Sequence, residues 1–173
     1  MEAADQPASA NALCRIEAPV RLSTVPVPSR PGTSVRLTER PIMACRFAAS
    51  FGHWIGDLVA PVVAGGAGSE LKAVRTGPGF EYRNRNRSAT GKLSAHAEGL
   101  AIDISGFELA NGSALRIKPE GNAPQNPTLA AVRTAACGWF TTVLGPGSDA
   151  AHHDHLHLDI IRHGSSDRYR ICQ

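Results

Sequence analysis

The segment at residues 152–159 reads HHDHLHLD and concentrates residue types that bind metals. It holds four of the seven histidines and two carboxylates, and it is followed by further sequence of ordinary composition. Dense histidine clusters that are patterned and flanked by apolar residues indicate metal chemistry. The segment therefore raises the question of which other residues would complete a site.

Alternation within this segment places two imidazoles on one side of a predicted strand. Side chains two positions apart in a β-strand face the same side, so His155 and His157 point together while Leu156 and Leu158 point into the core. A catalytic zinc ion usually takes three protein ligands and leaves one position open for water. A further ligand must therefore come from another segment.

Residues 94–103, SAHAEGLAID, offer that further ligand. His96 ends a basic loop, and Asp103 lies among apolar residues in the following strand. A carboxylate in such surroundings is costly unless a cation or a hydrogen-bond donor pairs with it. A salt bridge would explain Asp103 alone, and a surface position would explain His96 alone. Their combination with His-x-His favours a metal site.

The two segments resemble a known zinc motif. The order S-x-H-x-x-G-x-A-x-D, at residues 94–103, is similar to that of D-alanyl-D-alanine metallopeptidases and murein endopeptidases, whose superfamily includes lysostaphin and the hedgehog signalling domain. More closely, residues 14–172 resemble the extensin-like C-terminal domain of bacteria. That resemblance rests on the early Cys-Arg, the Ala-Cys helix around residue 45, the loop at 82–85, SAHAEGLAIDISGFELANG, CGWFTTVLGPGSD and HHDHLHLD.

The resemblance assigns roles to the residues of both segments. It implies that His96, Asp103 and His157 bind Zn²⁺. His155 then lies beside the metal as a proton-transfer group. Asp154 is a rival candidate for the general base, because D-alanine dipeptidases place their catalytic acidic residue three positions before the last ligand.

Two more residues belong to the expected site. Arg85 is expected to hold the substrate's carboxylate or the developing oxyanion, since its fork donates two hydrogen bonds to a carboxylate. Arg83 and Arg87 are expected to be solvated. Asp159 shares the strand face of His157 and could orient a zinc-bound imidazole.

The implied function is that of a zinc-dependent peptidoglycan peptidase. It would cleave peptide cross-links or stem peptides of the bacterial cell wall, with an endopeptidase favoured over a carboxypeptidase. The alternative is a non-catalytic, zinc-containing module that binds the cell wall, as hedgehog domains keep such a site in a binding role. The presence of both His155 and Asp154 favours the enzyme, because an inactive relative is expected to lack acid/base groups near the zinc ion.

The composition predicts one globular domain. The 173 residues are 42% hydrophobic and 19% charged, which is ordinary for a globular protein. We expect residues 1–13 to be a flexible tail and residues 14–173 to form a single, monomeric domain. The net charge is only +3, and the sequence lacks the clustered positive charge of a nucleic-acid-binding protein. The absence of a run of 18 apolar residues predicts that nothing spans a membrane.

Four scattered cysteines without metal-binding spacing predict two disulfides and an oxidising compartment. We expect the pairs Cys14–Cys45 and Cys137–Cys172, because each would tie a terminal segment to a nearby helix. Four reduced thiols in a cytosolic protein are the alternative. The expected location is periplasmic or secreted, with a signal peptide that is not part of this chain.

The order of predicted elements indicates an α+β fold, in which helices pack around a small antiparallel sheet that carries the zinc site. Proline-rich residues 17–40 predict strands and turns. Helices are predicted at 41–60, ended by Pro61, and at 128–144. Strands are predicted at 70–76, 99–109, 114–119 and 155–161, with a basic loop at 75–96.

Overall fold

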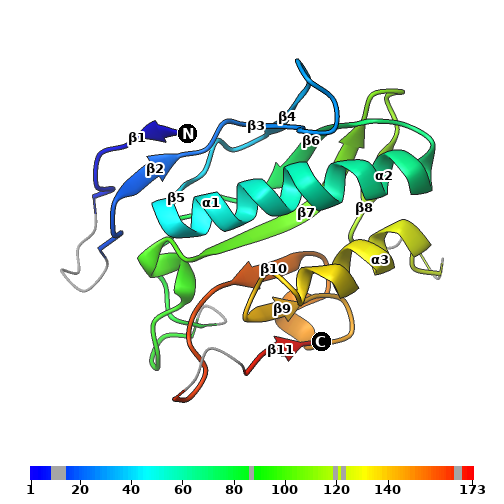
Figure 1. Ribbon diagram of the computed structural model, residues 1–173. Helices are drawn as coiled ribbons and strands as arrows, with labels where there is room; N and C mark the ends of the chain where they lie inside the picture. Colours follow the sequence, from blue (N-terminus) through cyan, green and yellow to red (C-terminus); the bar gives the residue numbers. More distant parts are fainter. Residues whose placement is uncertain (9–14, 86–87, 119–120, 122–123, 166–168) are drawn as a thin grey trace.

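The chain forms a mixed α+β structure with one large sheet (Figure 1). The computed structural model describes residues 1–8, 15–85, 88–118, 121, 124–165 and 169–173. Within them the large sheet has eight strands in the order β11-β9-β10-β7-β6-β4-β3, and β8 also pairs with β7. The strands are β3 Thr24–Pro26, β4 Ser34–Leu37, β6 Leu71–Thr76, β7 Ala101–Leu109, β8 Ala114–Arg116, β9 Thr142–Leu144, β10 Leu156–Asp159 and β11 Ile171–Cys172.

The α+β class is confirmed, but the sheet is larger than predicted and is mixed instead of antiparallel. Strands β4 and β6 run parallel, as do β9 and β11, while the other pairs are antiparallel. Parallel strands require a long crossover connection. The long helical segment between β4 and β6 provides the first crossover, which local sequence patterns do not reveal.

A second sheet lies at the N-terminal end of the chain. Its three strands are β1 Glu2–Ala3, β2 Pro19–Arg21 and β5 Ile42–Ala44, with β2 in the middle. Part of the predicted flexible tail is thus a strand, since Glu2 pairs with Arg21. The predicted extended structure at 17–40 is confirmed by β2, β3 and β4.

One continuous helical segment runs from Cys45 to Ala67, as α1 Cys45–His53, a π-helical turn Trp54–Val59, and α2 Ala60–Ala67. The prediction of a helix at 41–60 was wrong at both ends. At the start, residues 42–44 pair with β2 instead. At the far end, the amide of Ala60 donates to the carbonyl of Ile55, five residues back, and the widened turn accommodates Pro61, which has no N–H to donate.

This helical segment is long and apolar enough to cross a membrane by length and composition, although half of its most apolar window is buried inside the structure. A buried core helix passes the same test. Its inward side chains, Phe47, Phe51, Trp54 and Ile55, are fully buried in the hydrophobic core. One side of this helical segment therefore packs in the hydrophobic core.

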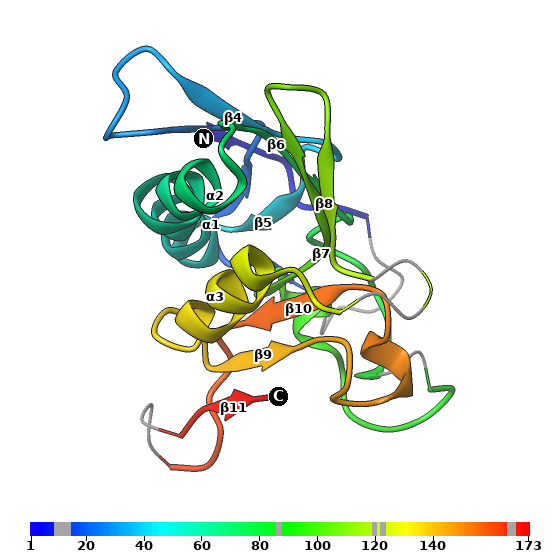
Figure 2. The same cartoon turned by 90° about the vertical axis from the view of Figure 1, so that its right-hand side faces the viewer.

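Helix α3, Pro127–Ala136, lies beside α2 on the same side of the sheet (Figure 2). Asn126 caps it by accepting hydrogen bonds from the amides of Thr128 and Leu129. The prediction of a helix through residue 144 was wrong, because Thr142–Leu144 pairs with β10 as strand β9. β-Branched residues such as Thr142 and Val143 fit a strand well.

The long central strand β7 joins the two halves of the sheet. Its first residues, 101–104, pair with β10, and its later residues pair with β6 and β8. Ile102 and Ile104 are fully buried in the core. The strands predicted at 70–76, 99–109, 114–119 and 155–161 are confirmed as β6, β7, β8 and β10, each of them shorter than predicted.

Candidate metal centre

A short 3₁₀ turn at Ala95–Glu98 carries His96. Ser94 caps the turn, because its hydroxyl accepts a hydrogen bond from the amide of His96. Gly99 ends the turn at φ 66°, and a Cβ there would lie 2.9 Å from the amide nitrogen of Ala44. The serine and glycine of the S-x-H-x-x-G motif thus hold His96 where β7 begins.

The pairing of β7 with β10 brings the other two predicted ligands together. Asp103 and His157 lie directly opposite each other in the antiparallel ladder. The neighbouring side chains Leu156 and Leu158 are buried in the core, as predicted. Alternation therefore turns Asp103 and His157 toward the other face, where the turn carrying His96 covers the sheet.

Three potential ligand atoms converge at this point. Asp103 Oδ1 lies 2.8 Å from His157 Nδ1 and 3.3 Å from His96 Nε2, and the two imidazole nitrogens are 3.3 Å apart. His96 and His157 are almost fully buried, and the side chain of Asp103 is 24% exposed. The sequence motifs thus bring together the three residues that they were predicted to bring together.

Each of the three side chains also forms a hydrogen bond with a different partner outside the group. The Nδ1 atom of His96 lies 3.0 Å from the carbonyl oxygen of Gly79, to which it donates. Asp103 Oδ2 accepts a hydrogen bond from Arg83 Nη2 at 3.3 Å.

His157 is held by a buried carboxylate. Its Nε2 atom lies 3.2 Å from Asp159 Oδ2, in the position that the sequence predicted for an orienting carboxylate. Asp159 is itself fixed, because its Oδ1 atom accepts from the amide of Ile161 and from the hydroxyl of Thr141. These contacts leave His96 Nε2, Asp103 Oδ1 and His157 Nδ1 turned toward one another.

Contacts within the group favour a negatively charged Asp103 and a positively charged His157. Burial would raise the pKa of Asp103, but hydrogen bonds from His157 and His96 and their charges hold it well below its usual range. Burial would lower the pKa of His157, but hydrogen bonds to Asp103 and Asp159 and their charges raise it to about 9. Without a bound metal, the imidazole of His157 is therefore doubly protonated and positively charged near neutral pH.

The match to known families covers the whole chain. The family model described as Extensin-like protein C-terminus matches residues 1–173. The chain belongs to this family. No curated protein and no solved structure matches it. The family description names no activity, so the function of this extensin-like domain must be argued from its site.

The group His96, Asp103 and His157 could hold a metal ion, since its ligand atoms lie within 4.8 Å of one another. A tetrahedral zinc ion bound at about 2.0–2.1 Å keeps its ligand atoms about 3.3 Å apart. Two of the three separations in the extensin-like domain match this value, and the third is 2.8 Å. Imidazole and carboxylate ligands with fixed outer partners are typical of metal centres.

His155 lies beside this group, with a carboxylate behind it. Its Nε2 atom is 3.7 Å from Asp103 Oδ1, and its Nδ1 atom is 2.9 Å from Asp154 Oδ1. The hydrogen bond from His155 lowers the pKa of Asp154, whose side chain is 48% exposed. Of the two rival candidates for the general base, His155 therefore faces the site and Asp154 orients it.

Arg85 and Arg83 lie in different surroundings, and the prediction for Arg83 was wrong. Arg85 is exposed and lines the cavity beside His157. Arg83 was expected to be solvated, and that prediction was wrong: its side chain is 15% exposed and donates to Glu81 and Asp103. Glu81 and Arg83 stand two residues apart in the sequence, and this spacing was the available signal. Arg87 lies outside the described residues.

A cavity of about 130 Å³ opens beside His157 and Asp159. His152 and His163 both line it. His152 is held by Asp149, and burial lowers its pKa. His163 Nε2 lies 2.7 Å from the hydroxyl of Thr142. Side chains that donate or accept hydrogen bonds therefore line part of the cavity, beside apolar residues such as Leu144 and Ile161.

The predicted disulfide Cys137–Cys172 is confirmed. It ties the residue after α3 to the last strand, β11, which pairs with β9. Ile171 of β11 lines the cavity beside His157. The predicted partner of Cys45, Cys14, lies outside the described residues.

Proposed function

We propose that this extensin-like domain is a zinc-dependent peptidase of the bacterial cell wall. The observation that carries the proposal is the convergence of His96, Asp103 and His157, each fixed from behind by its own partner. Bound there, a zinc ion would polarise a peptide carbonyl and lower the pKa of water. The resemblance of the motif to murein peptidases favours peptidoglycan as the substrate.

The chain supplies the proton-transfer group. His155 accepts a proton from the attacking water and later donates one to the leaving amine, as a general base and then a general acid. Asp154 holds the imidazole in the tautomer that leaves Nε2 facing the site. Exposed Arg85 lines the cavity and would bind a carboxylate of the substrate.

The remaining parts of the proposal rest on the composition of the chain and on its resemblance to murein peptidases. An endopeptidase is favoured over a carboxypeptidase, and the protein acts outside the cytoplasm as a monomer, without a nucleic-acid partner. The disulfide Cys137–Cys172 is compatible with that location. A zinc-containing module that only binds the cell wall is the competing function.

Digestion of purified peptidoglycan, followed by mass spectrometry of the released muropeptides, tests the proposal. The metal-loaded protein is expected to release peptides, and His155→Gln is expected to slow release by about 100- to 10,000-fold while the metal stays bound. His53→Gln, which changes an exposed histidine of α1, is the matched control. Absence of any cleaved bond with wild-type protein would favour the binding module, and loss of metal in His155→Gln would make His155 a ligand.

A further inference from the structure

Arg83 contacts the carboxylate oxygen of Asp103 that the two histidines leave free. Its Nη2 atom donates a hydrogen bond to Oδ2 at 3.3 Å, whereas His96 and His157 both lie against Oδ1. We propose that Arg83 is a positioning residue, which makes Asp103 bind a metal ion through Oδ1 alone. The inference rests on the proposed function for its metal centre, but it does not depend on hydrolysis.

The guanidinium of Arg83 is held in one orientation. Its Nε atom donates to Glu81 Oε2 at 2.9 Å, and its side chain is mostly buried. Its backbone carbonyl accepts from the amide of Ser94, which caps the turn of His96. Because the guanidinium is planar and rigid, the hydrogen bond to Glu81 fixes the direction in which Nη2 points. Arg83 is therefore anchored without the help of a metal.

The segment from Gly79 to Arg83 supports two of the three predicted ligands. The carbonyl oxygen of Gly79 accepts from His96 Nδ1, and Arg83 donates to Asp103. A Cβ at residue 79 would lie 2.6 Å from the carbonyl oxygen of Ile42, so only glycine lets the chain pass so close to β5. The relative positions of His96 and Asp103 therefore depend on this segment as well as on β7.

A carboxylate ligand has two oxygens, and the number that bind decides whether a position stays open at the metal. A catalytic zinc ion takes three protein ligands and keeps a fourth position for water. A second oxygen from Asp103 would compete for that position. To bind in this way, Asp103 would have to give up its charge-assisted hydrogen bond from Arg83. Arginine suits the role because it has donors only and cannot itself bind the metal.

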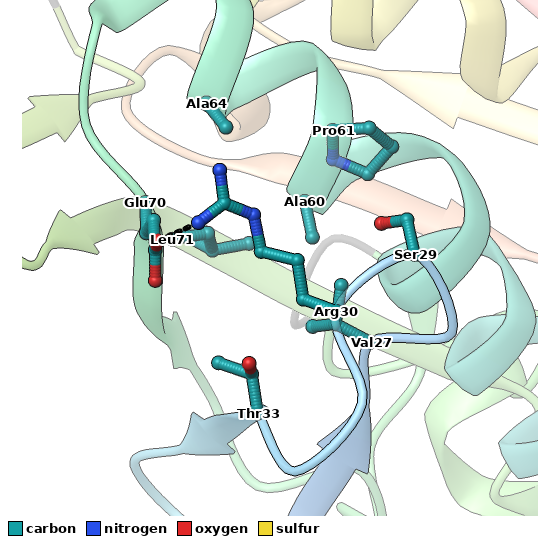
Figure 3. Close-up of a pocket in the computed structure, with 9 residues that line it drawn as sticks. All are labelled: Val27, Ser29, Arg30, Thr33, Ala60, Pro61, Ala64, Glu70 and Leu71. Carbon is teal, nitrogen blue, oxygen red and sulfur yellow. Dashed lines mark hydrogen bonds and ion pairs between the residues drawn. The ribbon is translucent and has the colours of Figure 1, made fainter.

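The ion pair between Arg30 and Glu70 provides a contrast (Figure 3). Arg30 reaches from the β3–β4 turn to the residue before β6, and both side chains are well exposed to solvent. Such pairs hold their partners weakly. Arg83 and Asp103 are largely shielded, and each is tied to further groups. The contact between Arg83 and Asp103 can therefore direct a ligand, whereas the pair in Figure 3 joins two surface segments.

Zinc-loaded crystals of the wild-type protein give the most direct test. Asp103 Oδ1 should lie about 2.0–2.2 Å from the ion, and Oδ2 should stay hydrogen-bonded to Arg83. Both oxygens at bonding distance from the ion would overturn the inference. This measurement requires no substitution, so it does not depend on how well a variant folds.

Arg83→Leu removes the donors, and the spectrum of bound cobalt(II) reports the result. Cobalt(II) can replace zinc in such sites and absorbs visible light more strongly with four ligands than with five or six. The variant should bind one cobalt ion with weaker absorption than the wild type, because Asp103 is then free to bind through both oxygens. Arg75→Leu, which removes an arginine from Glu108 on the same strand, is the matched control and should keep the wild-type spectrum.

Three results with variants shown by thermal melting to be folded would contradict the inference. The first is a cobalt spectrum of Arg83→Leu equal to that of the wild type. The second is complete loss of cobalt binding in Arg83→Leu, because an arginine that only selects how Asp103 binds is not needed for binding itself. The third is an equal loss of absorption in Arg75→Leu.

The two proposals fail in different ways, because neither the crystals nor the cobalt spectra require hydrolysis. A protein whose zinc ion is bound through Asp103 Oδ1 alone but which cleaves no peptidoglycan would refute the peptidase and keep the role of Arg83. A protein that cleaves peptidoglycan with both oxygens of Asp103 on the zinc ion would refute only the role of Arg83.

Discussion

Strand β7 carries two acidic residues, Asp103 and Glu108, in surroundings that differ in one respect. Their side chains are almost equally exposed, at 24% and 27%, and each accepts a hydrogen bond from arginine. Glu108 bridges Arg36 of β4 and Arg75 of β6. Asp103 instead accepts a hydrogen bond from one arginine, Arg83, and contacts two buried imidazoles, those of His96 and His157.

The difference shows what separates a group that could hold a metal ion from a surface ion pair. Arginine has donors only, so the oxygens of Glu108 are neutralised by groups that offer no lone pair to a metal. Imidazole offers a lone pair once its proton has left, and the outer nitrogens of His96 and His157 already have acceptors. The site end of β7 therefore carries groups that could exchange protons for a cation.

The largest effect is expected from Asp103→Asn. The amide keeps the shape of the side chain and removes the charge that binds the metal. Loss of a group that only supports a ligand costs about 10- to 100-fold in metal affinity, so loss of the ligand should cost more than about 100-fold. Metal titration against a competing chelator measures this affinity. Wild-type affinity in Asp103→Asn would show that the carboxylate is not a ligand.

A large pH dependence of metal binding is expected next. The pKa of His157, raised to about 9 without metal, means that a proton must leave when a metal binds. Apparent affinity should rise about tenfold per pH unit below pH 9, or about 100-fold from pH 6 to pH 8. Calorimetry in buffers of different ionisation enthalpy should detect release of about one proton. An affinity independent of pH over this range would contradict the assignment of His157.

The raised pKa of His157 also predicts how the stability of the folded protein changes with pH. The folded-state pKa of His157 is raised, so its ion pairs stabilise the metal-free protein fully below the unfolded pKa of about 6.5. This contribution is lost as the pH rises through about 9.

A smaller effect is expected from Asp159→Asn. The buried carboxylate behind His157 orients the imidazole and would make it a better ligand. Its replacement should weaken metal binding by about 10- to 100-fold and should leave the number of bound ions at one. A change in stoichiometry would mean that Asp159 itself binds the metal.

The smallest effect is expected from Glu108→Gln. Partly exposed ion pairs contribute little, so the free energy of unfolding should change by less than about 1 kcal/mol. Metal affinity should equal that of the wild type, which makes this variant the control for Asp103→Asn on the same strand. A metal affinity that falls as far as in Asp103→Asn would show that the strand, not the ligand, was disturbed.

The sequence predicted the three converging residues because motif spacing is a local property. The order of Ser94, His96, Gly99 and Asp103 encodes a capped turn followed by a strand, and His-x-His encodes one face of another strand. Strands β7 and β10 were found by alternation for the same reason.

The partners behind the ligands were harder to predict, because they depend on the path of a loop. Nothing local says that Arg83 reaches Asp103, or that the carbonyl of Gly79 meets His96. Long-range pairing also decided the parallel strands and the end of α3, where Thr142 joined the sheet. The π-helical turn before Pro61 overrode a strong local signal for a helix end.

The central claim is that His96, Asp103 and His157 hold one metal ion, and anomalous diffraction at the zinc absorption edge tests it most directly. Crystals grown with zinc should show one strong peak bounded by His96 Nε2, Asp103 Oδ1 and His157 Nδ1. Crystals of Asp103→Asn should lack it, and crystals of Glu108→Gln should keep it. A peak at the histidines of 152–155 instead, or none at the three converging atoms, would contradict the account.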